Sequence, residues 1–462
     1  MTELRLHNTL SGAKEVFTPI NPQDLTVYVC GPTVYDFVHI GNGRPAVVFD
    51  VLIRLLKATY PKVTYARNVT DIDDKINSAA IANGEPIQDL ADRYTEAYEN
   101  DMATLGVPAP DIAPRATHHI AEIVTMIGEL VAQGHAYEND GHVLFNVPSD
   151  PAYGSLSRRS LEDMLDGARV EIAPYKKDAK DFVLWKPSTG QLPGWDSPWG
   201  YGRPGWHIEC SAMIRKHLGT TIDIHGGGSD LTFPHHENEA AQSRCANGTP
   251  DYVRYWLHNG MLTMGGEKMS KSVGNVQKIR ELAKHHSGEV LRYALLGGQY
   301  RSPLAWGDDI LLQAKASLDT LYQALRDKPD SDHQPPDYAT WRLDQFPQAV
   351  VEALCDDLNT PLAQSALHEF AGRLQRGDDP DARSDLLAAG WLLGILDQDP
   401  EKHFKGTAGL EVSSDDIDAL IKARNDARAA KDYALADKVR DELIALGIEL
   451  EDTREGTRWR RS

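Results

Sequence analysis

Residues 25–56 restrict the possible folds more than any other part of this chain. They begin with a short apolar run at 25–29 that is typical of a buried strand, and they end at 45–56 in an amphipathic pattern that predicts a helix. A glycine-rich turn joins the two. A strand, such a turn and a helix form the unit from which parallel α/β sheets are built. The sequence therefore predicts an α/β protein with a Rossmann-type parallel sheet.

The turn itself has the chemistry of a phosphate site. Backbone N–H groups at the start of a helix point toward an anion. Gly41 and Gly43 would let a nucleotide approach closely, and His39 and Asn42 would supply side-chain donors. No Gly-Lys-Ser/Thr follows, so the turn is not a P-loop. An ordinary glycine-rich turn with a capping Asn is an equally open interpretation at this point.

Composition excludes several classes of protein. The chain has 462 residues, 41% of them hydrophobic and 25% charged, which indicates a globular protein of several domains. No apolar run approaches the ~18 residues of a membrane helix, and the N-terminus lacks the apolar core of a signal peptide. Four widely spaced cysteines predict a reducing cytoplasm with free or metal-bound thiols. The net charge of -20 argues against indiscriminate nucleic-acid binding, although local basic patches decide that question.

The next part of the chain continues the α/β pattern and then interrupts it. A strand is predicted at 62–70, followed at its carboxyl end by the acids of 71–74, and Thr70 is expected to face a ligand there. Asp73 and Asp74 could equally cap the next helix. Helices are predicted at 75–83, 86–105 and 117–133, and a strand at 141–147. Residues 148–204 are rich in Gly, Pro, Ser and Trp, which indicates an insertion with one clear strand at 181–185.

The second half is mostly helical. The α/β pattern resumes at 205–262, and helices are predicted at 287–296, 308–327, 340–375 and 381–395. Residues 413–462 show two helical patterns and then a hairpin. We therefore expect five parts: a split catalytic domain (1–147 and 205–262), an insertion (148–204), a lysine-loop region (263–305), a helical bundle (306–400) and a small C-terminal α+β domain (401–462).

Four scattered residues have the chemistry of metal ligands: Cys30, Cys210, His235 and Glu239. His235 and Glu239 are four residues apart on a predicted helix and share one face. Two thiolates, an imidazole and a carboxylate suit zinc. Spacing alone is a weak signal, because an isolated cysteine is usually a small buried hydrophobe. That second interpretation is preferred for Cys245 and Cys355, and an exposed helix face for His236 and Glu237.

A lysine-rich loop completes the pattern. Two ammonium groups on a glycine-flanked loop can close over a polyphosphate and neutralise charge as pyrophosphate leaves. Here the loop reads Lys268-Met-Ser-Lys271-Ser, and His39-Ile-Gly-Asn42 stands upstream. The pair resembles the HIGH and KMSKS signatures of class I aminoacyl-tRNA synthetases. Asn42 occupies the place of the second histidine, and its amide can still donate a hydrogen bond.

Longer motifs narrow the resemblance. Residues 30–36 (CGPTVYD), 67–75 (RNVTDIDDK), 205–213 (GWHIECSAM), 225–239 (HGGGSDLTFPHHENE) and the tail segment 434–440 are similar to those of the cysteinyl-tRNA synthetase family. The resemblance covers essentially the whole chain. It implies ATP-dependent ligation of L-cysteine to the cysteine tRNA through cysteinyl-adenylate, by a cytoplasmic monomer. It also implies that the insertion is connective, that 263–305 contacts the tRNA stem, and that 401–462 binds the anticodon.

The resemblance also implies roles for particular residues. Cys30, Cys210, His235 and Glu239 would bind one Zn²⁺, which would take the substrate thiolate and so select cysteine over serine. Mg²⁺ would accompany ATP. Thr70, Trp206 and Asp230 would line the amino-acid pocket, with Asp230 receiving the ammonium group. The catalytic and ATP-binding residues would be His39, Gly41, Asn42, Lys268 and Lys271.

Two other functions remain open. The related cysteine ligase of mycothiol synthesis shares this active site but joins cysteine to an amino sugar and lacks the tRNA-reading tail. A non-catalytic tRNA-binding relative would be expected to have lost part of the chemistry. The tail here carries basic residues beside an aromatic, which can contact phosphates and stack a base, or else form an ordinary mixed-charge helical pair. These residues are Lys422, Arg424, Arg428, Lys431, Lys438, Arg440, Arg454, Arg458, Trp459, Arg460 and Arg461.

Overall fold

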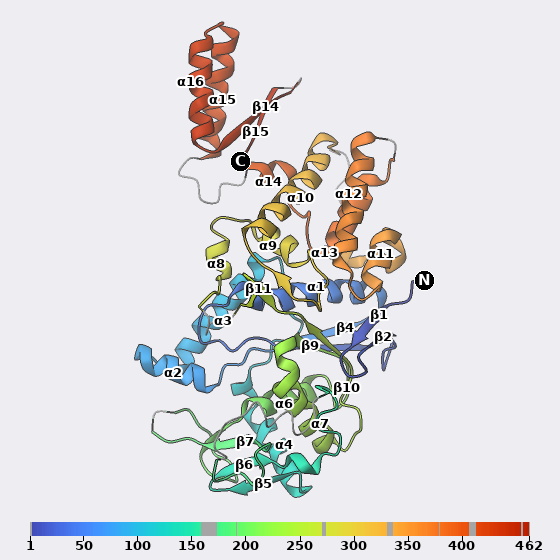
Figure 1. Cartoon of the computed structure of the whole chain (residues 1–462), viewed down its shortest axis with the longest axis vertical. Coiled ribbons are helices and arrows are strands. Elements are labelled where there is room, and N and C mark those ends of the chain that lie inside the picture. Colours follow the sequence, from blue (N-terminus) through green and yellow to red (C-terminus); the bar gives the residue numbers. More distant parts are fainter. Residues whose placement is uncertain are drawn as a thin grey trace.

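A four-stranded parallel sheet lies at the centre of the molecule (Figure 1). The computed structural model describes residues 2–158, 173–190, 192–269, 274–329, 336–377, 379–405, 413–453 and 456–461. The sheet has the order β10-β9-β3-β4, and β3 pairs in parallel with both β4 and β9. The predicted α/β class and parallel sheet are therefore confirmed. The strands are β3 (Leu25–Val29), β4 (Val63–Arg67), β9 (Ile222–Gly228) and β10 (Val253–Asn259).

Helices cover both faces of this sheet, which explains the uninterrupted apolar run of β3. Helix α1 (Ile40–Thr59) packs on one face, and α6 (Trp206–His217) and α7 (Glu237–Asn247) pack on the other. Helix α1 begins at Ile40, earlier than the predicted start at Pro45, because His39 caps it. The His39 Nδ1 accepts from Gly41 N at 3.1 Å, and Asn42 Oδ1 accepts from His39 N at 3.2 Å.

The segment predicted as an insertion contributes to a sheet at one end of the molecule (Figure 1). Four strands form this antiparallel sheet, which packs on α4 (Ile120–Ala132). The predicted strand at 141–147 corresponds to β6, which pairs in this sheet with β7. The shortest strands were not predicted, because three or four residues carry almost no periodicity. The strands are β5 (Ala136–Asn139), β6 (His142–Phe145), β7 (Phe182–Pro187) and β8 (Gly202–Pro204).

Smaller elements surround the central sheet. An antiparallel hairpin, β1 (Arg5–Asn8) and β2 (Ala13–Val16), opens the described chain. Helices α2 (Asp74–Asn83) and α3 (Ile87–Thr104) follow β4. A three-stranded sheet and two short helices continue from β10. These are β11 (Leu262–Met264), β12 (Glu267–Lys268), β13 (Leu304–Ala305), α8 (Ile279–Leu282) and α9 (Gly288–Leu295).

A helical bundle follows, and the prediction of one of its helices is wrong. The single helix expected at 340–375 is two helices, because Asp357 and Leu358 adopt positive φ angles of 60° and 51° between them. Asn359 caps the second helix by accepting from Leu362 N, and Pro361 stands in its first turn, which is a start signal that the sequence contains. The bundle comprises α10 (Asp308–Asp327), α11 (Gln348–Cys355), α12 (Thr360–Arg376), α13 (Ala382–Leu393) and α14 (Pro400–Lys405).

The C-terminal domain lies at the end of the molecule opposite to the insertion (Figure 1). Two helices, α15 (Ser414–Ala429) and α16 (Tyr433–Ala445), pack beside the hairpin β14 (Ile448–Thr453) and β15 (Gly456–Arg461), as predicted. Phe404 of α14 is buried in the bundle core. No helix among the described ranges is long and apolar enough to cross a membrane.

The interpretation of Trp459 as a base-stacking residue is wrong. Its side chain is 1% exposed and forms the centre of the small C-terminal core, with its indole N–H donating to Asp418 at 2.7 Å. The hairpin folds back onto α15 and covers it. Two of the predicted phosphate contacts, Arg424 and Arg428, pair with Asp452 instead. Arg454 lies outside the described residues.

A buried arginine ties α1 to the bundle. Arg292 of α9 is fully buried, and its guanidinium donates to the carboxylate of Asp50 on α1. It also donates to the backbone carbonyls of Leu393, Leu105 and Gly106. One side chain thereby satisfies acceptors from three parts of the chain, which fixes α1 against α9 and α13.

We expect Arg292→Met to lower the free energy of unfolding by about 3–5 kcal/mol, because the buried Asp50 loses one of its two arginine partners and three backbone carbonyls lose their donor. Urea denaturation followed by tryptophan fluorescence measures this loss. Arg93→Met, at an exposed ion pair of α3, is the control and should change stability by less than about 1 kcal/mol. An equally small effect at Arg292 would contradict the proposed tie.

Candidate active site

The candidate site is a cavity of about 460 Å³ at the carboxyl ends of the central strands. Its walls include residues that follow β3, β4, β9 and β10, and the first turns of α1. Open α/β sheets bind ligands at this edge. Several of the residues predicted from the sequence line the cavity: Cys30, His39, Gly41, Asn42, Trp206, Asp230 and Lys268.

The start of α1 forms one wall of the cavity. Because Nδ1 of His39 accepts from Gly41 N, a neutral His39 carries its proton on Nε2 and can donate from there. Asn42 uses its amide oxygen to accept from His39 N, which leaves the Nδ2 hydrogens as donors. The substitution of Asn for histidine at position 42 therefore keeps a donor at this wall and adds a helix cap.

Charged groups stand on the opposite side. Lys268, on β12, places its ammonium nitrogen 3.7 Å from Asp230 Oδ2, and both side chains are about half exposed. These two groups form an exposed ion pair at the cavity, and an ion pair of this kind costs little to separate. Lys271 lies outside the described residues.

Of the two other residues predicted for the amino-acid pocket, Trp206 lines the cavity, and Thr70 is not among the described residues on its walls. Trp206, the first residue of α6, lines the cavity and stacks on the imidazole of His235, with ring centroids 4.1 Å apart and an interplanar angle of 9°. Thr70 is 2% exposed, and its hydroxyl lies 3.4 Å from Asn68 Nδ2. Its predicted contact with the amino acid stays a prediction.

The four predicted metal ligands come together behind this cavity. Cys30 Sγ lies 3.7 Å from Cys210 Sγ and 3.6 Å from His235 Nε2, and Cys210 Sγ lies 3.7 Å from the same nitrogen. Glu239 Oε2 lies 3.7 Å from His235 Nε2. Three of the four side chains are fully buried, and Cys30 alone among them lines the cavity. One ion held there would be reachable from the cavity past Cys30.

The geometry fits a tetrahedral metal ion. Zinc–sulfur and zinc–nitrogen bonds in a tetrahedron separate two sulfurs by about 3.8 Å and a sulfur from a nitrogen by about 3.6 Å. The observed separations agree closely. In addition, Glu239 Oε2 is buried without a hydrogen-bond partner, a state that is costly unless a ligand completes it. Tyr252 donates to the other oxygen, Oε1, at 2.7 Å, and so orients the carboxylate.

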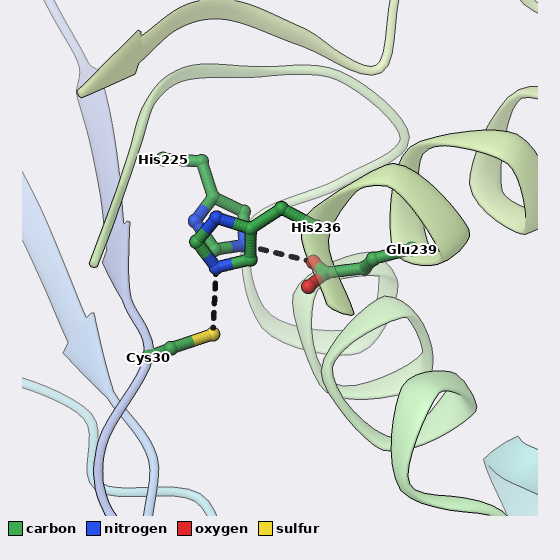
Figure 2. Close-up of side chains that lie close together, drawn as sticks. All are labelled: Cys30, His225, His236 and Glu239. Atoms are coloured by element: carbon green, nitrogen blue, oxygen red, sulfur yellow. Dashed lines mark hydrogen bonds and ion pairs between the residues drawn. The ribbon is translucent and has the colours of Figure 1, made fainter. Parts of the chain in front are cut away.

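A second group shares two of these ligands and comprises Cys30, His225, His236 and Glu239 (Figure 2). Here His225 Nε2 lies only 2.8 Å from Glu239 Oε1, which is a direct hydrogen bond. His236 Nε2 lies 3.4 Å from Cys30 Sγ, and its Nδ1 lies 2.7 Å from His258 Nε2. Because its members already bind one another, this group suits a supporting layer around the first group better than a coordination shell.

The histidines of this layer were missed. His236 and Glu237 were expected on an exposed helix face, but both are fully buried, because α7 runs between the central sheet and the insertion. Glu237 accepts from the backbone N–H groups of Gly154 and Ser157 and so anchors the insertion. Hydrophobic periodicity does not predict the burial of such a helix, since its buried residues include polar side chains beside alanines and a cysteine. The sequence HHENE was the available signal, because adjacent histidines and acids are expensive to bury without partners.

Burial also sets the protonation of the group. It raises the pKa of Glu239 to about 8 and raises the pKa of the Cys30 thiol, while it lowers the pKa of His235. Each shift disfavours the charged form in a low-dielectric interior. A divalent cation supplies the opposite charge that would hold two thiolates and a carboxylate there.

Comparisons with known proteins agree with this picture. A family model described as "tRNA synthetases class I (C) catalytic domain" matches residues 16–316, a DALR domain model matches 349–396, and a "Cysteinyl-tRNA ligase anticodon binding domain" model matches 413–460. Among solved structures, methionyl-tRNA synthetase from Mycobacterium tuberculosis, in complex with methionyl-adenylate, shares the fold. Its TM-score is 0.56 at 15% identity, over 82% of this chain and 93% of that one. The fold and the site together define a class I aminoacyl-tRNA synthetase.

Curated relatives are far more similar. The chain is 56% identical to a cysteine–tRNA ligase of Saccharophagus degradans, over 99% of each chain. It is 55% identical to that of Parvibaculum lavamentivorans, over 99% of this chain and 98% of the relative. It is 53% identical to that of Rhodospirillum rubrum, over 99% and 100%. The chain belongs to the cysteine–tRNA ligase family.

The two candidate groups make different predictions for metal content. We expect the purified protein to hold about one zinc per chain, and Cys210→Ala to lose most of it, because that substitution removes a ligand of the first group alone. Metal analysis by mass spectrometry measures the ratio. Cys245→Ala, at a buried thiol outside both groups, is the control. Retention of zinc in Cys210→Ala together with its loss in His236→Asn would assign the metal to the second group.

Proposed function

We propose that this chain joins L-cysteine to its cognate tRNA in two steps, first forming cysteinyl-adenylate from cysteine and ATP and then transferring the acyl group to the terminal ribose. One observation supports this most. The candidate metal group reaches the cavity at Cys30, and the capped start of α1 lines the same cavity. The group comprises Cys30, Cys210, His235 and Glu239. A thiol-binding group and a phosphate-binding helix end in one cavity suit two substrates, one with a thiol and one with phosphates.

The phosphate side needs no covalent intermediate with the protein. The cysteine carboxylate attacks the α-phosphate of ATP in line, and pyrophosphate leaves. The N–H groups of α1, the Nε2 of His39 and the amide of Asn42 hold phosphate oxygens while charge develops on them. Lys268 and Lys271 neutralise the departing pyrophosphate, and Mg²⁺ accompanies ATP. The half-exposed position of Lys268 suits a group that must move toward its ligand.

The thiol side selects the amino acid. When bound, zinc supplies a soft Lewis acid that prefers a thiolate to a hydroxyl. A pocket without it would separate cysteine from serine by only about 1–3 kcal/mol. In this chain Cys30 presents the group to the cavity, Trp206 stacks on His235 beside it, and Asp230 stands across the cavity as a partner for the substrate ammonium group.

The C-terminal domain supplies the tRNA contact in this proposal, which separates the chain from an amino-sugar ligase. Since Trp459 is buried, another aromatic side chain must stack any base there. Tyr433, the first residue of α16, is 64% exposed and follows Lys431 in the loop between α15 and α16. An exposed ring beside a cation is the arrangement that stacks unpaired bases. We further propose a monomer that works in the cytoplasm.

The activity has a direct test. We expect cysteine-dependent exchange of pyrophosphate into ATP and charging of total tRNA with cysteine, and no ligation of cysteine to an amino sugar. Lys271→Ala should slow pyrophosphate exchange by roughly two to four powers of ten, since it removes a cation that acts mainly in the transition state. Exchange at the wild-type rate in that variant would reassign the loop to a structural role, and an amino-sugar product would refute the proposed substrate.

We expect Tyr433→Ala to lower kcat/KM for tRNA about 10- to 100-fold, the effect of losing one base–aromatic contact of ~1–3 kcal/mol. Pyrophosphate exchange should be unchanged, because the cavity is remote from α16. Tyr433→Phe keeps the ring and should charge tRNA nearly as well as wild type. Aminoacylation kinetics at one fixed salt concentration measure all three proteins. Equal kinetics for Tyr433→Ala and wild type would place the anticodon contact elsewhere.

A further inference from the structure

One buried arginine in the cavity wall, Arg67, has no carboxylate partner among the described residues. Arg67, the last residue of β4, is 6% exposed and lines the cavity. No hydrogen bond or ion pair joins its guanidinium to a carboxylate or carbonyl of the described residues, and its Nη1 is buried without a partner. The ring of Tyr98 lies under it, 5.6 Å from the guanidinium carbon, and the Tyr65 phenol is its other close neighbour.

The other arginines of similar burial are all paired. Arg44 and Arg292 donate to backbone carbonyls, and Arg292 also reaches Asp50. Arg203, Arg326 and Arg424 each bind a carboxylate. The carboxylate of Asp50 also acts on Arg67 electrostatically, but it already binds Arg54 and Arg292. An unpaired buried guanidinium is costly for the fold, so its place in a substrate cavity indicates that a ligand completes it.

The position of Arg67 indicates which anion it meets. In the sheet order β10-β9-β3-β4, the strand that Cys30 follows lies between the strand that leads to Asp230 and the strand that ends at Arg67. Arg67 pairs in register with Val29, directly before Cys30. A Cβ added to Gly31 would lie 3.8 Å from Arg67 Cγ, so the arginine side chain passes beside the residue that follows Cys30.

We infer that Arg67 binds the carboxylate of the substrate amino acid, an assignment that rests on the proposed function. When the sulfur of the substrate cysteine lies at the metal group beside Cys30, its ammonium group lies toward Asp230. Its carboxylate then lies toward Arg67, on the other side of β3. The α-phosphate is held by the start of α1, which covers the same face of the sheet as Arg67. Arg67 thus places the attacking carboxylate between the metal group and the phosphate, and a planar guanidinium is the donor best suited to hold it.

Ligands that differ only in the carboxylate test this assignment. Wild-type protein should bind L-cysteine more tightly than cysteamine, which lacks the carboxylate, in isothermal titration calorimetry without ATP. Arg67→Met should weaken L-cysteine binding about 10- to 100-fold, as expected for a lost charge-assisted hydrogen bond, and leave cysteamine binding within about twofold. Arg67→Lys should restore part of the preference. The melting temperature of Arg67→Met should equal or exceed that of wild type, because the charge that it removes has no partner in the fold.

Other outcomes would overturn the assignment. Equal losses for both ligands, or a lower melting temperature, would make Arg67 a structural residue. A change confined to KM for ATP would assign it to the α-phosphate, and one confined to KM for tRNA would assign it to the terminal nucleotide. If wild-type protein exchanges pyrophosphate with cysteine while Arg67→Met behaves identically, only the role of Arg67 fails. If wild-type protein shows no such exchange, the proposed function fails and the assignment with it.

Discussion

Parallel pairing of β3 with both β4 and β9 decides where every reactive group of this protein lies. Parallel strands end at the same edge, so residues far apart in the sequence meet there once the register is set. Cys30 follows β3, Arg67 ends β4 and Asp230 follows β9. The metal group adds Cys210 and Glu239 from the helices that cover one face of the same sheet. A register shift in β3 would separate all of them at once.

The interior behind this edge is polar, and hydrogen bonds make that tolerable. His225, His236 and His258 are nearly or fully buried, and burial lowers the pKa of each, so all three are neutral imidazoles that both donate and accept. His225 binds Glu239, and His236 binds both His258 and Cys30. Such a layer orients the candidate metal ligands and limits their movement. It also explains why polar residues of α7 are buried, since the layer that they contact is itself polar.

Much of the fold and the signature motifs could be predicted from the sequence. Particular residues show why the rest could not. The buried run of β3, the helical patterns of the bundle and the C-terminal hairpin have clear periodicity, so their existence was predictable. Residues of the two signature motifs were recognisable because each is contiguous. The strand β6 is as apolar as a central strand, and only its pairing with β5 and β7 shows to which sheet it belongs. Trp459 was misjudged for a related reason, since composition does not reveal which aromatic a small domain uses as its core.

Arg67 shows a different limit. In the sequence it is one of two basic residues in RNVTDIDDK, beside three acids, and nothing there distinguishes it from Arg203, which does pair with Asp74. Only the coordinates reveal that the neighbouring acids are committed elsewhere. Asp71 accepts from Thr117, and Asp74 binds Lys186 and Arg203 of the insertion. Because these two acids hold the insertion and the segment before α4, they do not pair with Arg67, which lines the cavity at the end of β4. Three neighbouring strands then offer a sulfur site, an anion and a cation about one strand spacing of ~4.8 Å apart. If Arg67 and Asp230 hold the substrate carboxylate and ammonium groups as proposed above, three unlike contacts around one carbon atom would also distinguish its two mirror-image configurations.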